Sequence, residues 1–380
     1  MLFKIKHFAV NWIDGMKISK DHFIDTNNYI TDLVRDATSN HITTYNYGLL
    51  PCNDSTNSFE ISITKENKSF FSIILKRCYA ITMGGIKINY DSQNGIPLSI
   101  TKEVHENANT IDTFYIILIT NPYQRTPIGT PSLEENPPRH PYSDITYTID
   151  IIPNTEINLQ NLGAFHLVLG KIIYKDGQTC IQENYIPPCT SINSHKKLIE
   201  HYISIKKSMT HLQNTSLSII KKVQDKNKHS TLSKNITILC QNILSYISST
   251  CYSFSNELFE NEPIKVVGHV ASLALNQYNS IQCFIENEQE EFLKYIFEWT
   301  DLTPKEFEDI LFSSSFIPYD HNEINKSMEM ALYYLNVTEK IWIKMNTLEF
   351  IGQRRENMVV THELIQIKEE QPKKRWSILD

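Results

Sequence analysis

The spacing of apolar residues changes near Pro188, and this change constrains the fold more than any other feature of the sequence. Before Pro188, apolar residues alternate over residues 59–63, 145–151 and 165–169, with the period of two expected for strands that have one buried face. After it, apolar residues recur every three or four positions, which is the spacing of helices. The sequence therefore predicts an α+β protein in which strands precede helices. Its length of 380 residues predicts two or three domains.

The first 190 residues have the turn signals of an antiparallel sandwich. Glycine-containing turns at residues 83–85, 94–95 and 176–177 separate short apolar runs. Many short strands between regularly spaced turns favour two packed antiparallel sheets. We therefore expect residues 1–190 to form a β-sandwich shell domain.

Two segments of this region are less regular. Residues 24–37 fit either a short helix or a further strand. Residues 121–143 contain six prolines in 23 positions. Because proline cannot donate a backbone hydrogen bond, this density predicts a long extended loop without ladder hydrogen bonds. Such a loop is either an arm that grips a partner or a mobile loop.

A heptad-like pattern begins after residue 194. Its seven apolar positions are spaced four and three apart, interrupted only at Ser216: Leu198, Tyr202, Ile205, Met209, Leu212, Ile219 and Val223. A period of about 3.5 over nearly four heptads is typical of the seam of a coiled coil or a tight bundle. The seam either joins three copies of the chain in a homotrimer, which is our first expectation, or packs inside its own subunit.

Further helices are expected over residues 230–254, 263–278, 290–299, 304–312 and 320–346. Thr303 and Glu306 match the pattern of a capping box, and Asp320 is the expected N-cap of the last helix. We expect residues 191–346 to form a helical neck and trimerisation domain. A short C-terminal tail, residues 347–380, is expected to follow.

The stretch VNWIDGMKISKDHF, residues 10–23, combines large apolar side chains with a turn. Trp12, Met16 and Phe23 stand around Gly15, a residue type that accepts a positive φ without steric cost. The pattern fits a strand, a turn and an anchor buried inside the domain. The alternative is an anchor for a partner protein, since tryptophan and methionine are enriched at the centres of interfaces.

Composition excludes several classes of function. The net charge of −7 and the lack of a lysine- and arginine-rich stripe argue against nucleic-acid binding. No run approaches the roughly 18 apolar residues of a membrane-spanning helix, and the first fifteen residues lack the apolar core of a secretory signal. The seven cysteines have no zinc-ligand spacing, so we expect reduced, mostly buried thiols in a cytoplasmic protein.

A search for catalytic motifs finds none. The sequence contains no G-x-S-x-G, Walker, G-x-G-x-x-G or H-E-x-x-H pattern. The thirteen histidines are scattered, and none has a second ligand at metal-site spacing. His22 is expected to be a buried histidine that donates to a backbone carbonyl rather than a catalytic group. We therefore expect no enzymatic activity, no cofactor and no metal.

Three short motifs occur along the chain. They are Trp12, Gly15-Met16 and His22-Phe23; then Tyr185–Cys189, reading YIPPC; then Tyr319–His321, reading YDH. In type and order they resemble motifs of the TssK family, the trimeric baseplate adaptors of bacterial type VI secretion systems. In that family Pro-Gln usually precedes His-Phe, whereas Lys20-Asp21 stands here. The resemblance therefore implies a divergent branch.

The resemblance implies a β shell, similar to the shoulder of phage receptor-binding proteins, and a helical neck, in a homotrimer at the cytoplasmic face of the inner membrane. It also implies that the shell contacts a wedge of TssF and TssG. The partner-binding residues are then expected to be Trp12, Gly15, Met16, His22 and Phe23.

TssK-like proteins also have a C-terminal head domain that contacts the inner-membrane complex. Residues 347–380 are too few to form such a domain, so we expect the head to be missing. The tail, with Met358–Ile367 as an added strand, is then expected to bind the membrane-anchor protein as a peptide. The alternative function is that of a trimeric phage-tail-like receptor- or carbohydrate-binding protein, which shares the shoulder-and-neck plan.

Overall fold

The structure is a computed structural model, which describes residues 6–51, 57–66, 70–94, 97–103, 112–159, 162–175, 178–225, 230–300 and 302–353. The chain divides into two compact units. Unit 1 comprises residues 1–203, 255–267 and 318–329, and unit 2 comprises residues 204–254, 268–317 and 330–380. The expected boundary near residue 190 therefore separates strands from helices rather than the two units.

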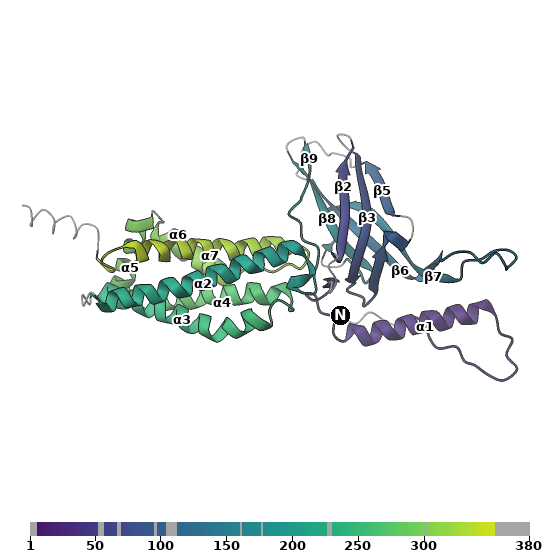
Figure 1. The fold of residues 1–380 in the computed structure, drawn as a ribbon, viewed down its shortest axis with the longest axis horizontal. Helices are drawn as coiled ribbons and strands as arrows, with labels where there is room; N and C mark the ends of the chain where they lie inside the picture. The colour runs from purple at the N-terminus through teal and green to yellow at the C-terminus, as the bar shows by residue number, and fades with distance from the viewer. Residues whose placement is uncertain are drawn as a thin grey trace, which may run out of the picture. The chain divides into compact units, whose positions relative to one another are not determined.

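The strands of unit 1 form two antiparallel sheets (Figure 1). The first contains β1 (Gly48–Leu49), β2 (Phe59–Lys65), β3 (Phe70–Ile81), β4 (Lys87–Asp91) and β5 (Leu98–Glu103), and β3 pairs with each of the other four. The second has the order β7-β6-β8-β9, with β6 at Asp112–Ile128, β7 at Tyr142–Pro153, β8 at His166–Lys175 and β9 at Gln178–Ile181.

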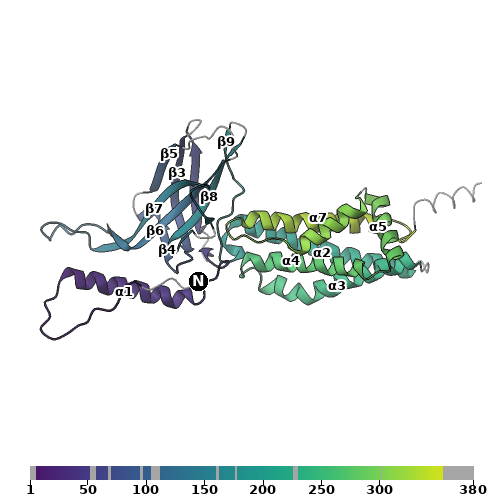
Figure 2. The same cartoon turned by 180° about the vertical axis from the view of Figure 1, so that it is seen from behind.

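The two sheets form two layers, as expected for a sandwich (Figure 2). A Cβ added to Gly170 of β8 would lie 3.3 Å from Cδ1 of Ile63 in β2, so the absent side chain lets the sheets approach closely. Lys102 of β5 forms an ion pair with Asp150 of β7 at 2.6 Å. These contacts confirm the predicted α+β fold with an antiparallel β part.

The proline-rich segment 121–143 is not one long loop. β6 continues to Ile128 and pairs with β7 as far as Tyr142, with a register irregularity between Asn121 and Arg125. Pro122 falls inside this irregularity, where the ladder has no hydrogen bond for it to break. The expectation of a segment without ladder pairing is therefore wrong, because a bulge accommodates the proline and the strands resume beyond it.

The structure also tests the predicted glycine-containing turns and the expected burial of the cysteines. The turn at residues 83–85 is present, with Gly85 at φ 79°, whereas the predicted turns at Gly95 and at residues 176–177 lie outside the described residues. The six described cysteines are free, but only three are buried: Cys78, Cys189 and Cys240 are buried, and Cys180, Cys251 and Cys283 are exposed. The expectation of mostly buried thiols is therefore wrong for half of them.

The helices lie close to the expected positions. They are α1 (Lys20–Ser39), α2 (Lys196–Asp225), α3 (Thr231–Asn256), α4 (Pro263–Gln282), α5 (Glu286–Thr300), α6 (Pro304–Ser315) and α7 (Ile324–Thr347). At the start of α6 the Thr303 hydroxyl accepts from the Glu306 N–H at 3.3 Å, and the Glu306 carboxylate accepts from the Thr303 N–H at 3.0 Å. This confirms the predicted capping box. Asp320 is not the N-cap of α7, because the helix begins four residues later and Asp320 instead accepts from the Asn322 N–H.

Four helices, α2, α3, α4 and α7, lie side by side in a bundle (Figures 1 and 2). Within unit 2, Ser208 of α2 donates to Glu339 of α7 at 2.7 Å, and Asn242 of α3 donates to Ser280 of α4 at 2.8 Å. Polar side chains thus join neighbouring helices along the bundle.

The heptad-like seam of α2 is filled within one chain. All seven residues are at most 7% exposed: Leu198, Tyr202, Ile205, Met209, Leu212, Ile219 and Val223. Side chains that are already buried in the subunit have no apolar surface left for a second copy. The expectation that these residues form an inter-subunit trimerisation seam is therefore corrected. Heptad spacing predicts that one face of a helix is buried, but it does not predict which chain buries that face.

The segment after α7 begins as part of unit 2. Leu348 and Ile351 are each 8% exposed, and the Gly352 N–H donates to the Tyr295 hydroxyl at 3.2 Å. The tail expected over 347–380 is therefore packed at its start. Residues 354–380, including the predicted strand Met358–Ile367, lie outside the described residues. In the described part of the chain, no helix has both the length and the apolar character needed to span a membrane.

Candidate functional site

The N-terminal segment turns back on itself before α1. Gly15 has φ 78°, and the Met16 N–H donates to the Ile13 carbonyl at 3.3 Å, so the predicted turn is present. Trp12 and Phe23 are 50% and 57% exposed, and their ring centroids are 6.4 Å apart. The interpretation of these two side chains as an anchor buried inside the domain is therefore wrong. The structure instead brings them together at the surface.

His22 caps helix α1. Its Nδ1 accepts a hydrogen bond from the Ser19 N–H at 3.1 Å, and the Ser19 side chain faces the same ring. The pair forms a capping box, in which the imidazole takes the place of the usual glutamate. The expectation of a buried histidine that donates to a carbonyl is therefore wrong, because His22 is half-buried and acts as an acceptor.

A buried polar network fixes α1 on the sandwich. Asp32 is 1% exposed, and Arg35 donates to it at 2.7 Å. The Tyr123 hydroxyl of β6 donates to Asp32 and also accepts from Arg35. Arg35 Nε donates to the Gly84 carbonyl at 3.1 Å. The side of α1 that packs on the β-sandwich is therefore polar.

The same carboxylate holds the N-terminal segment. The backbone N–H groups of Lys6 and His7 each donate to Asp32 at 2.9 Å, and the His7 ring lies 3.1 Å from it. Burial opposes ionisation of Asp32, but hydrogen bonds from Tyr123 and from these two N–H groups outweigh it and hold the pKa well below its usual range. The ionised Asp32 carboxylate thus connects α1 to β6 and to residues 6–7 by hydrogen bonds. In the sequence, only the spacing of Asp32 and Arg35, three residues apart, marks this site, and such a spacing by itself predicts no site.

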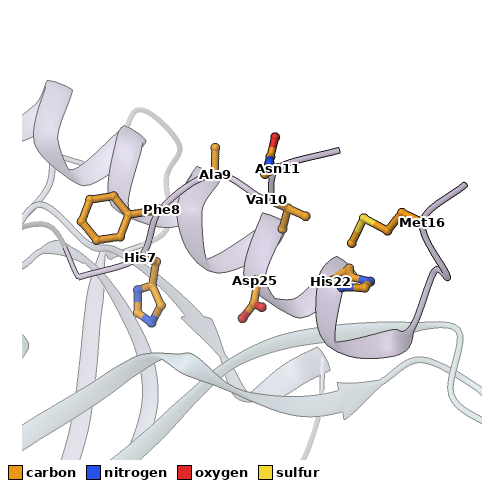
Figure 3. Close-up of a pocket in the computed structure, with 8 residues that line it drawn as sticks. All are labelled: His7, Phe8, Ala9, Val10, Asn11, Met16, His22 and Asp25. Atoms are coloured by element: carbon orange, nitrogen blue, oxygen red, sulfur yellow. The ribbon is translucent and has the colours of Figure 1, made fainter. Parts of the chain in front are cut away.

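A pocket of about 400 Å³ opens between the N-terminal segment and the first turns of α1 (Figure 3). Phe8, Val10 and Met16 supply apolar walls, and His22 and Asp25 supply polar groups from the helix. Met16 and His22, two of the predicted partner-binding residues, thus line one cavity. Among the described residues, no group of three His, Cys, Asp or Glu side chains is placed to hold a metal ion.

The second and third sequence motifs meet at β1. The Leu49 N–H donates to the Pro188 carbonyl at 2.7 Å, and the Thr190 N–H donates to the Leu49 carbonyl at 2.9 Å. His321 Nε2 lies 2.8 Å from the Tyr47 carbonyl. The YIPPC and YDH segments, 130 or more residues apart in sequence, therefore contact neighbouring residues of unit 1, Leu49 in β1 and Tyr47 just before it.

The protonation state of His321 follows from its partners. A carbonyl only accepts, so Nε2 carries the proton, and Nδ1 accepts from the Tyr319 hydroxyl at 2.8 Å. Burial lowers the pKa of His321 to about 4. The ring is therefore a neutral structural joint between the YDH segment and β1.

Comparison with known proteins relates the fold to one family. Neither a protein-family model nor a curated protein matches the sequence. Among solved structures, a crystal structure of TssK matches with a TM-score of 0.52 and 14% identity, covering 87% of this chain and 69% of that one. A chain of the baseplate complex from the type VI secretion system matches with a TM-score of 0.50 and 11% identity, covering 87% of this chain and 99% of that one. The chain therefore has a TssK-like fold.

Proposed function

We propose that this protein is a structural component of a type VI secretion baseplate and a divergent member of the TssK family. The observation that carries the proposal is the TssK-like fold over 87% of the chain. The three TssK-like sequence motifs support it independently, because the resemblance of these residues does not depend on the comparison of folds. The role is structural, with no catalytic step, cofactor or metal, and the protein acts in the cytoplasm.

The partner-binding site in this proposal is the N-terminal segment with the start of α1. Trp12 and Phe23 provide exposed apolar surface, Met16 lines the pocket, Gly15 forms the turn and His22 caps the helix. Large exposed aromatic side chains are frequent anchors of interfaces. The partners we propose are TssF/TssG-like wedge proteins, by resemblance to the family.

The assembly we propose is a homotrimer, also by resemblance. The buried seam of α2 does not supply its contacts, so the trimer would be formed by other surfaces. The tail beyond residue 353 is proposed to bind the membrane-anchor protein and so to hold the baseplate at the inner membrane.

Co-expression with the TssF/TssG-like proteins of the same genome tests the function. The proposal expects a stable complex with the wedge and a trimeric mass by light scattering. Trp12→Ala should weaken co-purification at least tenfold while the mass and the fold are unchanged. Ile285→Ala, which removes a side chain that is 70% exposed in unit 2, is the matched control and should have no effect. If no wedge protein binds and a glycan array captures the chain instead, the receptor-binding alternative replaces this proposal.

The tail requires a deletion that spares the packed residues. Leu348 and Ile351 are buried, so the truncation should remove residues 354–380 only. Wedge binding should survive, whereas secretion or attachment to the envelope should fail. Normal secretion by the truncated protein would contradict the proposed role of the tail in anchoring.

A further inference from the structure

A second cavity, of about 400 Å³, lies within unit 2 between the end of α5 and helix α7. Trp299 and Leu302 line it on the side of α5. Helix α7 supplies four lining residues: Val337, Lys340, Ile341 and Lys344. Spacings of three and four residues place all four on one side of the helix. Ile341 is 2% exposed, whereas both lysines are exposed. The cavity therefore has apolar walls and two ammonium groups at its rim.

The two lysines at the rim carry charges that the described residues do not neutralise. Within the described part of the chain, neither ammonium group has a hydrogen-bond or ion-pair partner. Lys340 and Lys344 stand one turn apart, where side chains of a helix are neighbours, so their charges repel each other. The carboxylate next to Lys340 in sequence, that of Glu339, already accepts from Ser208 at 2.7 Å and faces His211 at 2.6 Å. An anionic group at this rim would form charge-assisted hydrogen bonds and relieve the repulsion.

The apolar surface continues along α7 beyond the cavity. Tyr333, one turn before Val337, is 58% exposed. At 100° per residue, Tyr333, Val337 and Lys344 lie within about 40° of one another around the helix, and the distance along the axis from Tyr333 to Lys344 is roughly 16 Å. We call this strip, together with the cavity, the α7 groove. A strip of about three turns suits a segment of polypeptide, whose successive side chains can occupy it along its length.

The charges of the α7 groove favour a different protein over a symmetric pair of copies. A two-fold axis brings the same surface of both copies together. Such a pair would place the Lys340 and Lys344 of one copy against the same two lysines of the other. Like charges oppose this contact, whereas a segment with carboxylates complements it.

We propose that the α7 groove binds an acidic segment of a partner protein, which inserts a large apolar side chain into the cavity and places a carboxylate between Lys340 and Lys344. This goes beyond the proposed function, which assigns no partner to these helices. The apolar side chain packs on Trp299 and Ile341 and supplies most of the affinity. The carboxylate fixes the register of the segment along α7.

A subtractive selection tests this chemistry. A phage-displayed library of random peptides is first depleted on the Lys340→Gln/Lys344→Gln double variant, which removes peptides that bind elsewhere, and is then selected on the full wild-type chain. The selected peptides should combine a large apolar residue with aspartate or glutamate. Replacing that acidic residue by its amide should weaken binding to the wild type about tenfold. The same replacement should have no effect on the weaker binding to the double variant.

Three further variants place the binding in the α7 groove. Tyr333→Ala, at an exposed position, should weaken binding of the selected peptides several-fold. The matched control is Lys206→Gln with Lys207→Gln, at exposed positions of α2. It removes the same charge from unit 2 and should change nothing. Asp301 precedes Leu302 in the sequence and lies outside the described residues. Asp301→Asn should leave peptide binding unchanged or strengthen it, and weaker binding would contradict an anionic ligand.

Several results would overturn the inference. One is a selection that leaves no peptide, and another is selected peptides without an acidic residue. A third is a loss of binding in the α2 control as large as that in the double variant. Self-association that the double variant loses would assign the groove to a second copy. Binding to phosphatidylglycerol vesicles that the double variant loses, without any peptide binding, would assign it to a membrane surface.

The inference and the proposed function can fail separately. Wedge co-purification should be unchanged in the Lys340→Gln/Lys344→Gln variant, because the proposed wedge site is the N-terminal segment. Wedge binding without acidic-peptide binding would therefore contradict only the inference. Acidic-peptide binding without wedge binding would contradict only the proposed function.

Discussion

His321 Nε2 donates a hydrogen bond to the Tyr47 carbonyl oxygen, 2.8 Å away, across 274 residues of sequence. The contact joins the loop before α7 to the residue that precedes β1, the strand that contacts the YIPPC segment. Its dependence on a neutral, buried imidazole makes the stability of unit 1 dependent on pH.

Acid should destabilise unit 1 between about pH 6.5 and pH 4. Burial lowers the pKa values of His321 and His195 to about 4 in the folded chain, against about 6.5 when unfolded. The unfolded chain therefore binds more protons in this range, so stability is full above pH 6.5 and falls as the pH drops. Each histidine accounts for roughly 3 kcal/mol when the loss is complete. Urea unfolding at several pH values should show a shallower dependence for His321→Gln, whereas His41→Gln, at an exposed position, should match the wild type.

Gly48→Ala should be strongly destabilising. Gly48 has φ +109°, and an added Cβ would lie 2.0 Å from the Pro188 carbonyl oxygen, so both strain and a backbone clash result. We expect a loss of about 3 kcal/mol or more. Gly268→Ala is the matched control, since nothing lies within 4 Å of its added Cβ in α4, and it should stabilise the helix by about 0.5–1 kcal/mol. Equal unfolding midpoints for the two variants would contradict the close approach at β1.

Truncation of the α2 seam should lower stability rather than change the oligomeric state. Ile205 and Leu212 are fully buried in the chain, so replacing either by alanine should cost roughly 2–5 kcal/mol. Leu217→Ala, at a 41% exposed position of the same helix, should cost less than about 1 kcal/mol. Denaturant unfolding measures the cost, and light scattering measures the mass. If the Ile205 variant dissociates from an oligomer while its bundle keeps its stability, the seam lies at the interface between subunits and this prediction is wrong.

Arg35→Met should detach α1 while leaving the sandwich folded. The substitution removes the donor to Asp32 and to the Gly84 carbonyl, and breaking a buried ion pair commonly costs about 3–5 kcal/mol. Hydrogen exchange should then lose protection over residues 24–39 and keep it in β3 and β6. Arg125→Met is the control. This arginine is exposed, and among the described residues its one hydrogen bond with α1 is a long one of 3.5 Å to the Thr31 hydroxyl. Undiminished protection of α1 in Arg35→Met would show that other contacts hold the helix.

The sequence alone determined the features that depend on neighbours along the chain. Alternation over residues 145–151 places Ile149 and Ile151 on the more buried face of β7, because successive side chains of a strand point to opposite sides. The Thr303–Glu306 capping box is equally local, since it satisfies helix N–H groups three residues apart. The helical part of the chain follows from the same kind of spacing.

Only the tertiary structure decided which surfaces these elements meet. A heptad spacing shows that one face of α2 is buried, but the chain's own helices rather than a second copy fill it. In α1 the positions of Asp32 and Arg35 become a packing face only because Tyr123 and the Gly84 carbonyl, far away in sequence, supply their partners. The spacing of residues predicts that one face of an element is buried, whereas long-range contacts decide which part of the chain packs on that face. Trp12 and Phe23 show the same limit: their spacing fits a buried anchor, but no other described part of the chain packs over them, and they lie at the surface.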